Sequence, residues 1–250
     1  LKYIKIYLPP LPTQKKIAKI LSNYDDLIEN NLKRIKLLEE SARLTYEEWF
    51  LRFRIDGVKL DIDSETGFPY GWGIEKFKTQ LNFKTGKLDS NAVVPDGIYD
   101  FYTCAKEIFK TNTTCFNGEA VLLGGNNATG DFSLFYANSK FDAYQRTYIV
   151  TSDNLPLVYV FFVLKNYLPY FKNISSGAAT KFLTMRILDQ INILIPKSEV
   201  IVMFQKQIKP MFDSVINLKN QNQRLKEARD ILLPRLMTGI IDTENMDIKL

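Results

Sequence analysis

The sequence predicts a mixed α/β (α+β) domain held between two long helices that form an antiparallel coiled coil. The first observation is a heptad pattern of apolar residues in the region 13–56, and the second is the same pattern in 199–238. The third is the stretch 57–198, where short aromatic and β-branched runs alternate with turn-forming glycine, proline and asparagine. Residues 239–250 are predicted to be a C-terminal tail.

The first helix is predicted from Thr13, a suitable N-cap, to Arg54, with Gly57 as the stop signal. A helix of about 40 residues would be roughly 60 Å long, far longer than the usual helix of a globular domain. Its apolar positions alternate steps of four and three, which is typical of a coiled-coil seam, so a partner helix is expected. The seam residues are Ile17, Leu21, Tyr24, Ile28, Asn31, Ile35, Leu38, Ala42, Thr45 and Trp49.

The middle stretch opens with a loop at 57–73 and then carries the signals of a mixed α/β domain. Helices are predicted at 74–81, 157–168 (ended by Pro169) and 183–189, strands at 99–104, 120–123, 132–136, 146–150 and 191–195, and loops at 84–87 and 175–181. The glycine-rich segment 124–130 lacks the Lys-Ser/Thr of a phosphate loop and the setting of a dinucleotide site. It therefore predicts a tight hairpin.

An internal repeat links the two ends of the chain. Displacing the sequence by 187 residues places Ile4–Pro9 on Ile191–Pro196, and the first seam on a second one. The second seam consists of Phe204, Ile208, Met211, Val215, Leu218, Asn222, Leu225, Arg229, Leu232 and Leu236. Strand, proline break and heptad helix thus occur twice around one globular domain. Because the chain begins at Leu1, without Met and within a strand-like run, it is expected to be a fragment or a processed piece.

The two seams also predict a register. Placing Asn31 opposite Asn222 pairs residues of similar size or polarity along both helices, except that Tyr24 meets Arg229 and could stack on it. A buried asparagine pair costs stability and fixes register; the alternative that both asparagines are solvated stays open. Pro210 is expected to kink or delay the second helix. The predicted interface comprises Leu21, Ile28, Asn31, Ile35, Leu38, Trp49, Phe204, Met211, Val215, Leu218, Asn222 and Leu225.

Composition removes several classes of function. The chain contains no histidine, which excludes His-based zinc sites, Ser–His and Cys–His nucleophiles and histidine general bases. Its two cysteines, Cys104 and Cys115, are too few for a disulfide framework. The net charge of +5 permits a nucleic-acid partner without requiring one. No signal pattern or sufficiently long apolar run is present, so a cytoplasmic protein without membrane contact is expected.

Motifs of nucleic-acid enzymes are missing as well. No carboxylate pair precedes a lysine at the spacing of a nuclease, and no Asn/Asp-Pro-Pro-aromatic motif of an aminomethyltransferase occurs. The sequence therefore predicts no catalytic residue and no metal ligand. A stand-alone nuclease or methyltransferase is the least favoured class.

The loops of the middle domain combine basic, amide and hydroxyl side chains. Arginine pairs with guanine and asparagine or glutamine with adenine, while lysine and threonine hold phosphates. Each group alone is more often a solvated loop, but together they predict a DNA-binding surface. The candidate residues are Lys84, Lys87, Thr103, Lys106, Asn126, Asn127, Tyr144, Gln145, Arg146, Thr180 and Lys181.

Several segments, in this order, resemble those of one known family, the specificity (S) subunits of type I restriction–modification systems, and specifically the C-terminal half. Leu8–Ala18 resembles the junction into the central conserved helix of that family, and Glu48–Phe50 the end of that helix. Further matching segments are Pro69–Trp72, Phe101–Ile108, Asp142–Tyr148, Gly177–Phe182 and Leu232–Gly239. The resemblance covers essentially the whole chain.

The resemblance implies a division of labour. The stretch 57–198 would be a target recognition domain that contacts half of a bipartite site in double-stranded DNA, and the helices would be a spacer that docks methyltransferase (M) subunits. A motor–nuclease (R) subunit would join the full complex. The chain itself would be non-catalytic and hold no cofactor, since S-adenosylmethionine, ATP and Mg²⁺ are expected only in the partner subunits.

The sequence departs from the family pattern because it has one recognition domain where the family has two. Residues 1–12 would then be an orphan strand and linker from a missing first domain. Since both conserved helices are present, two chains could pair through them as a homodimer. The alternative function is a coiled-coil scaffold whose globular domain binds a protein.

Overall fold

The computed structural model describes residues 9–175 and 180–242; the predicted strand at 1–8 and most of the predicted tail lie outside them. The chain forms two compact units. Unit 1 combines the chain up to Leu44 with the chain from Pro210 onward, and unit 2 is Thr45–Lys209. Two helices, α1 (Leu11–Tyr46) and α5 (Ser198–Met237), each run from one unit into the other.

The two long helices are present, as predicted. α1 begins two residues before Thr13 and ends earlier than expected, in a π-helical turn η1 (Glu47–Leu51), so Arg54 already belongs to a strand. The expectation that Pro210 would delay the second helix is wrong, because α5 starts at Ser198 and contains both Pro210 and Pro234. A proline removes one backbone hydrogen bond, and 40 residues of continuous helix absorb that loss.

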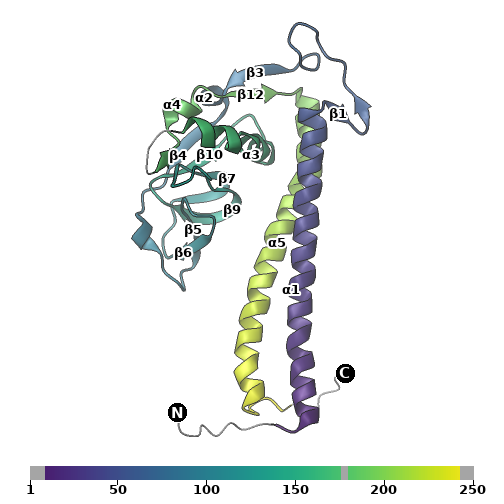
Figure 1. Cartoon of the computed structure of the whole chain (residues 1–250), viewed down its shortest axis with the longest axis vertical. Helices are drawn as coiled ribbons and strands as arrows, with labels where there is room; N and C mark the ends of the chain where they lie inside the picture. The colour runs from purple at the N-terminus through teal and green to yellow at the C-terminus, as the bar shows by residue number, and fades with distance from the viewer. Residues whose placement is uncertain (1–8, 176–179, 243–250) are drawn as a thin grey trace. The chain divides into compact units, whose positions relative to one another are not determined.

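In unit 1 the helices lie side by side and antiparallel (Figure 1). Asn31 Nδ2 donates to Asn222 Oδ1 at 2.9 Å, and both side chains are buried, which answers the question of solvated asparagines. Next to this pair, apolar residues of the two seams form one cluster, made of Ile35, Leu38, Val215 and Leu218. The asparagine pair therefore sits in an apolar layer, where only one register satisfies both amides.

Ion pairs flank the seam of unit 1. Lys219 pairs with Glu39 at 3.0 Å, and Arg229 pairs with Asp25 at 2.6 Å. The guanidinium of Arg229 thus binds the residue beside Tyr24 instead of stacking on the tyrosine ring. Exposed pairs of this kind contribute little stability, but opposite charges across the seam favour the antiparallel orientation.

Unit 2 is built on a six-stranded sheet in the order β4-β10-β7-β9-β5-β6. All neighbours are antiparallel except β5 and β9. The strands are β4 (Asn82–Thr85), β5 (Tyr99–Tyr102), β6 (Ile108–Thr111), β7 (Phe116–Gly124), β9 (Leu134–Ala143) and β10 (Thr147–Thr151). The other elements are β1 (Arg54–Ile55), β2 (Val58–Lys59), β3 (Gly73–Lys76), α2 (Phe77–Gln80), η2 (Ser90–Ala92), β8 (Asn126–Asn127), α3 (Leu157–Ile174), β11 (Lys181–Phe182), α4 (Met185–Leu188) and β12 (Asn192–Ile195).

The sheet is strongly curved. Tyr102, at the end of β5, pairs with Ala143 at the end of β9. The carbonyl of Thr103, one residue later, accepts a hydrogen bond from Ser133, which lies just before β9 begins. β9 therefore curls until both of its ends approach the end of β5. The curved face encloses a core of Tyr102, Ala120, Leu122, Ala137, Phe141, Ala143 and Ile149, and α3 packs against β7 and β9 (Figure 1).

A second, aromatic core lies around the end of η1 in unit 2. Phe204 is fully buried, with ring centroids 5.8 Å from Trp49 and 4.8 Å from Phe50. Tyr159 is also buried and donates its hydroxyl to the carbonyl of Leu194 at 2.8 Å. Burial raises the pKa of this phenol well above its ordinary value, because the charged form would lose its hydration. The register predicted from the sequence also sets Trp49 opposite Phe204, and in the structure these two residues belong to a larger aromatic cluster.

Three secondary-structure predictions need correction. The helix predicted at 74–81 is present only as α2 (Phe77–Gln80), because residues 73–76 pair with the distant β12 and form β3. α3 continues past Pro169 to Ile174, where burial of Phe171 against the domain compensates for the lost hydrogen bond. The segment 84–87 is half strand, since Lys84 pairs with Ile149 in β10.

The prediction of a tight hairpin at 124–130 is also wrong. β7 and β9 do pair antiparallel, but the connection between Gly124 and Leu134 is a long loop and not a tight hairpin. It contains β8, which pairs with β11. The strands β1, β2, β6, β8 and β11 and the short helix η2 have no counterpart in the predicted elements.

Candidate nucleic-acid interface

Backbone hydrogen bonds bring the loops of unit 2 together at one end of the curved sheet. Gln145 N–H donates to the carbonyl of Leu88, and Tyr144 N–H donates to that of Tyr102, both at 2.9 Å. Gly125 N–H donates to the carbonyl of Arg146 at 2.7 Å. The segments that follow β4, β5, β7 and β9 therefore meet there. We call the surface formed by residues 84–88, 103–106, 124–131, 144–146 and 180–183 the loop face.

All predicted DNA-contacting residues lie on or beside the loop face, at different depths. The exposed ones are Lys84, Lys87, Lys106, Gln145 and Arg146. The half-buried ones are Asn126, Asn127, Tyr144, Thr180 and Lys181, and Thr103 is buried. β8 and β11 place Asn127 opposite Lys181 and Asn126 opposite Phe182, so residues more than 50 positions apart share one edge.

Some of these side chains are occupied within the loops. Thr103 Oγ1 accepts from Ala105 N–H at 3.1 Å, and Asn127 Oδ1 accepts from the N–H groups of Thr129 and Asp131 at 2.8 and 3.1 Å. Asn126 Oδ1 is buried and accepts no hydrogen bond within the described part of the chain. Thr103 and Asn127 therefore shape the loops, and the exposed lysines, Gln145 and Arg146 present free donors.

The loop after β7 is tied to α3 by an ion pair. Lys172 Nζ lies 2.7 Å from Asp131 Oδ1. The hydrogen bonds from Lys172 and Thr129 lower the pKa of the Asp131 carboxyl, because they favour its charged form. Between these anchors Gly130 adopts φ = 79°, a conformation that disfavours residues with a Cβ. The loop thus has a defined shape.

Five cations of the loop face form no ion pair with the described residues, although the charge of Lys106 does act on the nearby Asp131 carboxyl and helps to lower its pKa. Lys84, Lys87, Lys106, Arg146 and Lys181 form no ion pair with any residue that the structure describes. In unit 1, by contrast, Lys219 and Arg229 each pair with an acid of the other helix. A group of unpaired cations gives the loop face a positive potential and free hydrogen-bond donors.

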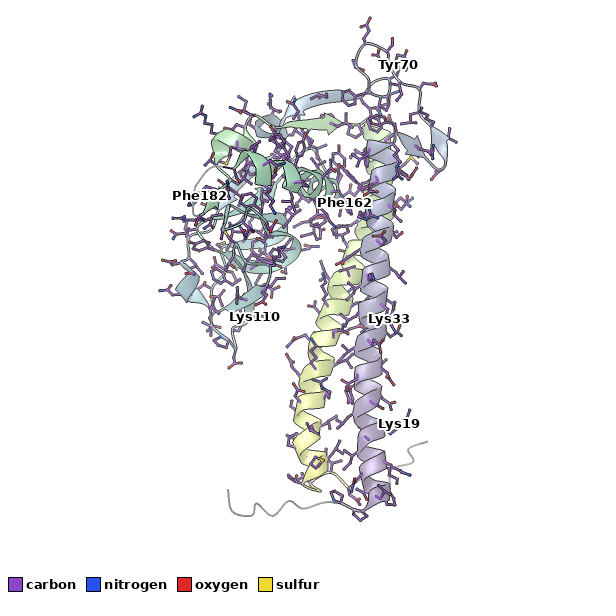
Figure 2. The ribbon with its side chains drawn as sticks, in the orientation of Figure 1. Lys19, Lys33, Tyr70, Lys110, Phe162 and Phe182 are labelled. Atoms are coloured by element: carbon purple, nitrogen blue, oxygen red, sulfur yellow. The ribbon has the colours of Figure 1, made fainter. Side chains whose placement is uncertain are left out.

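Phe182 and Gly125 belong to the loop face but are not among the predicted site residues. Phe182, labelled in Figure 2, lies under Arg146, whose guanidinium carbon is 5.3 Å from the ring centroid. Gly125 is buried between the two neighbouring segments. The sequence signal for Phe182 was its position directly after Lys181 in a candidate segment; the pairing with Arg146 requires the fold.

Two negative observations concern only the part of the chain that the structure describes. None of its helices is long and apolar enough to cross a membrane. In the same residues, no three histidine, cysteine, aspartate or glutamate side chains gather closely enough to hold a metal ion.

Comparisons with known proteins agree on one family. A family model described as "Type I restriction modification DNA specificity domain" matches residues 1–40 and 76–228. The EcoDI specificity subunit of Escherichia coli is 27% identical over 180 residues, covering 70% of this chain and 40% of the relative. The MjaIX specificity subunit of Methanocaldococcus jannaschii is 24% identical over 276 aligned positions, covering 98% and 62%.

A solved structure shares the fold. The type I restriction–modification S subunit from M. genitalium superposes with a TM-score of 0.65 at 18% identity, covering 90% of this chain and 61% of that one. This chain thus spans between 40% and 62% of the length of the three similar proteins.

Proposed function

Because the chain belongs to the family of type I restriction–modification DNA specificity subunits, we propose that the loop face of unit 2 recognises one half of a bipartite site in double-stranded DNA. The observation that carries the proposal is the gathering of five unpaired cations with exposed Gln145 on one loop-built surface. Relatives with the same domain are named specificity subunits, in agreement with a chain that selects a DNA sequence and leaves catalysis to others.

In this proposal the lysines and the residues near the base edges have different tasks. Lys84, Lys87 and Lys106 are exposed and flexible, which suits point contacts with phosphate oxygens that orient the domain. Gln145 and Arg146 sit together in the short connection between β9 and β10, and both side chains are exposed, which suits contacts with base edges in the major groove. The backbone hydrogen bonds that hold residues 144–146 in place reduce the conformational entropy lost on binding.

Unit 1 would act as a spacer and a docking surface. Its paired helices are stiff, so their length would set the distance between two recognised half-sites. On the side of α1 away from the seam, Leu37 and Leu44 are 69% and 42% exposed. Exposed leucines one heptad apart suit contact with methyltransferase subunits. The motor–nuclease subunit would join that assembly, and S-adenosylmethionine, ATP and Mg²⁺ would be held by these partners.

Salt dependence of DNA binding tests the role of the loop face. If the four lysines of the loop face, Lys84, Lys87, Lys106 and Lys181, each neutralise a phosphate while Arg146 contacts a base, the slope of log K against log salt concentration should be about −3.6. Replacing Lys87 and Lys106 with alanine should reduce the slope by about 2, measured by fluorescence anisotropy with mixed-sequence duplex DNA. The control replaces Lys33 and Lys219, which are paired in unit 1, and should leave the slope unchanged. Equal slopes for both double variants would contradict the assignment.

A second proposal concerns assembly. Two copies of this chain would pair through their long helices and so present two loop faces to a palindromic bipartite site. Light scattering at micromolar concentration should then give about twice the mass of one chain. A single-chain mass, with and without DNA, would rule this assembly out.

A further inference from the structure

We propose that Arg146 recognises a guanine in the major groove and that Phe182 is the positioning residue that orients its guanidinium. The inference rests on the proposed DNA-binding function and assigns one base and two roles within the loop face. Neither the family match nor the names of the relatives assign a function to either residue.

The backbone fixes the two residues relative to each other through Gly125. Its N–H donates to the carbonyl of Arg146 at 2.7 Å, and its carbonyl accepts from Leu183 N–H at 2.9 Å. Gly125 thus joins the turn that carries Arg146 to the residue after Phe182. Tyr148 strengthens this link, since its hydroxyl donates to the carbonyl of Leu183 at 2.8 Å.

Only glycine fits at the junction. A Cβ on residue 125 would lie 2.5 Å from the carbonyl oxygen of Arg146 and 3.1 Å from a ring carbon of Tyr148. The first distance is too short for any real contact and involves backbone, which cannot swing away. The close approach of the two chain segments on either side of Gly125 is therefore what places the Phe182 ring under the side chain of Arg146.

The Phe182 ring orients the guanidinium of Arg146, which forms no hydrogen bond or ion pair with the described residues. A cation over a ring face at 5.3 Å is held with a modest energy, and the contact leaves the edge of the guanidinium free. The planar fork of arginine matches the O6 and N7 acceptors of guanine, whereas adenine offers a donor in place of O6. An arginine already oriented by a ring loses less freedom when it makes these two bonds.

Phe182 contributes little to the core of unit 2. Its side chain is half-buried, whereas the adjacent Leu183 is 2% exposed and packs inside. A leucine at position 182 would keep most of the apolar contact and remove the π face. The two possible roles of Phe182, as packing and as a platform for Arg146, can therefore be separated by substitution.

The experiment selects bound sequences from a random duplex DNA pool with the full chain and with four variants. Arg146→Ala should remove the preference for guanine at one position of the enriched sequence, a loss of about 10- to 100-fold against the other bases. Phe182→Leu should weaken the same preference by about 2- to 5-fold, and Phe182→Tyr should restore it. Arg186→Ala, which removes another exposed arginine without an ion pair in the described residues, should change no position.

A duplex carrying 7-deazaguanine at that position provides a second readout, since this base lacks the N7 acceptor. The wild-type chain should bind it less tightly than the guanine duplex, and Arg146→Ala should bind both equally. Thermal melting within a few degrees of wild type confirms that each variant is folded.

The outcomes separate the two levels of the proposal. If the wild-type chain enriches no sequence, the proposed DNA recognition fails, and the inference with it. If it enriches sequences but Arg146→Ala keeps every guanine preference, the inference alone is overturned. If Phe182→Leu matches wild type at every position, Phe182 does not orient Arg146.

Discussion

Replacing Phe204 with alanine should lower the free energy of unfolding by about 3–5 kcal/mol, the range measured for large aromatic side chains removed from protein cores. Phe204 has no exposed surface and lies among the rings of Trp49, Phe50 and Tyr159. Its loss would leave a cavity that these rigid rings cannot fill. Urea denaturation followed by tryptophan fluorescence measures the effect, because Trp49 reports directly on this cluster.

Val202 provides the matched control for this substitution. It lies on the same helix two residues earlier, and its side chain is 59% exposed. Val202→Ala should change the free energy of unfolding by less than about 0.5 kcal/mol, as is usual for surface positions. A loss below about 1 kcal/mol for Phe204→Ala would show that the aromatic cluster is not the tightly packed core described above.

Single and double substitution of the asparagine pair of unit 1 should change the melting temperature in opposite directions. Asn222→Leu leaves the amide of Asn31 buried without its partner, which costs about 1–3 kcal/mol. Replacing both with leucine removes both amides, so the melting temperature should rise above that of the wild type while the register becomes less specific. Circular dichroism at 222 nm measures both melting temperatures.

Asn30 serves as the control for the pair. It is exposed on the same helix, so Asn30→Leu should leave the melting temperature nearly unchanged. If the double variant of Asn31 and Asn222 melts below the wild type, the buried pair does not lower the stability of the coiled coil, and this interpretation is wrong.

Local periodicity explains why the helices and their register could be predicted from the sequence. A heptad pattern requires only neighbouring residues on one helix, and the asparagine in each seam marks where the two meet. β3 could not be predicted in this way, because Gly73–Lys76 becomes a strand only through pairing with β12, more than 100 residues later. The helix end predicted at Pro169 is wrong for a related reason. Burial of Phe171 against the domain outweighs the local effect of the proline.

The candidate site was predictable as a set of residue types but not as an arrangement. The side chains of Arg146 and Lys181 suit DNA by their chemistry alone, and the fold places them on one surface. The buried position of Thr103 and the structural hydrogen bonds of Asn127 follow from how the loops close. Phe182 gains its place under Arg146 only through β8 and β11, which no local pattern indicates.

The junction at Gly125 has a practical consequence for changing the DNA sequence that the chain selects. The bonds that hold the neighbouring loops there are made by main-chain atoms of Gly125, Arg146 and Leu183 and thus do not depend on which side chains project outward. Positions 145, 146 and 181 could therefore be randomised together in a library while Gly125 is kept. Most members of such a library should fold, and they would differ in the bases they contact.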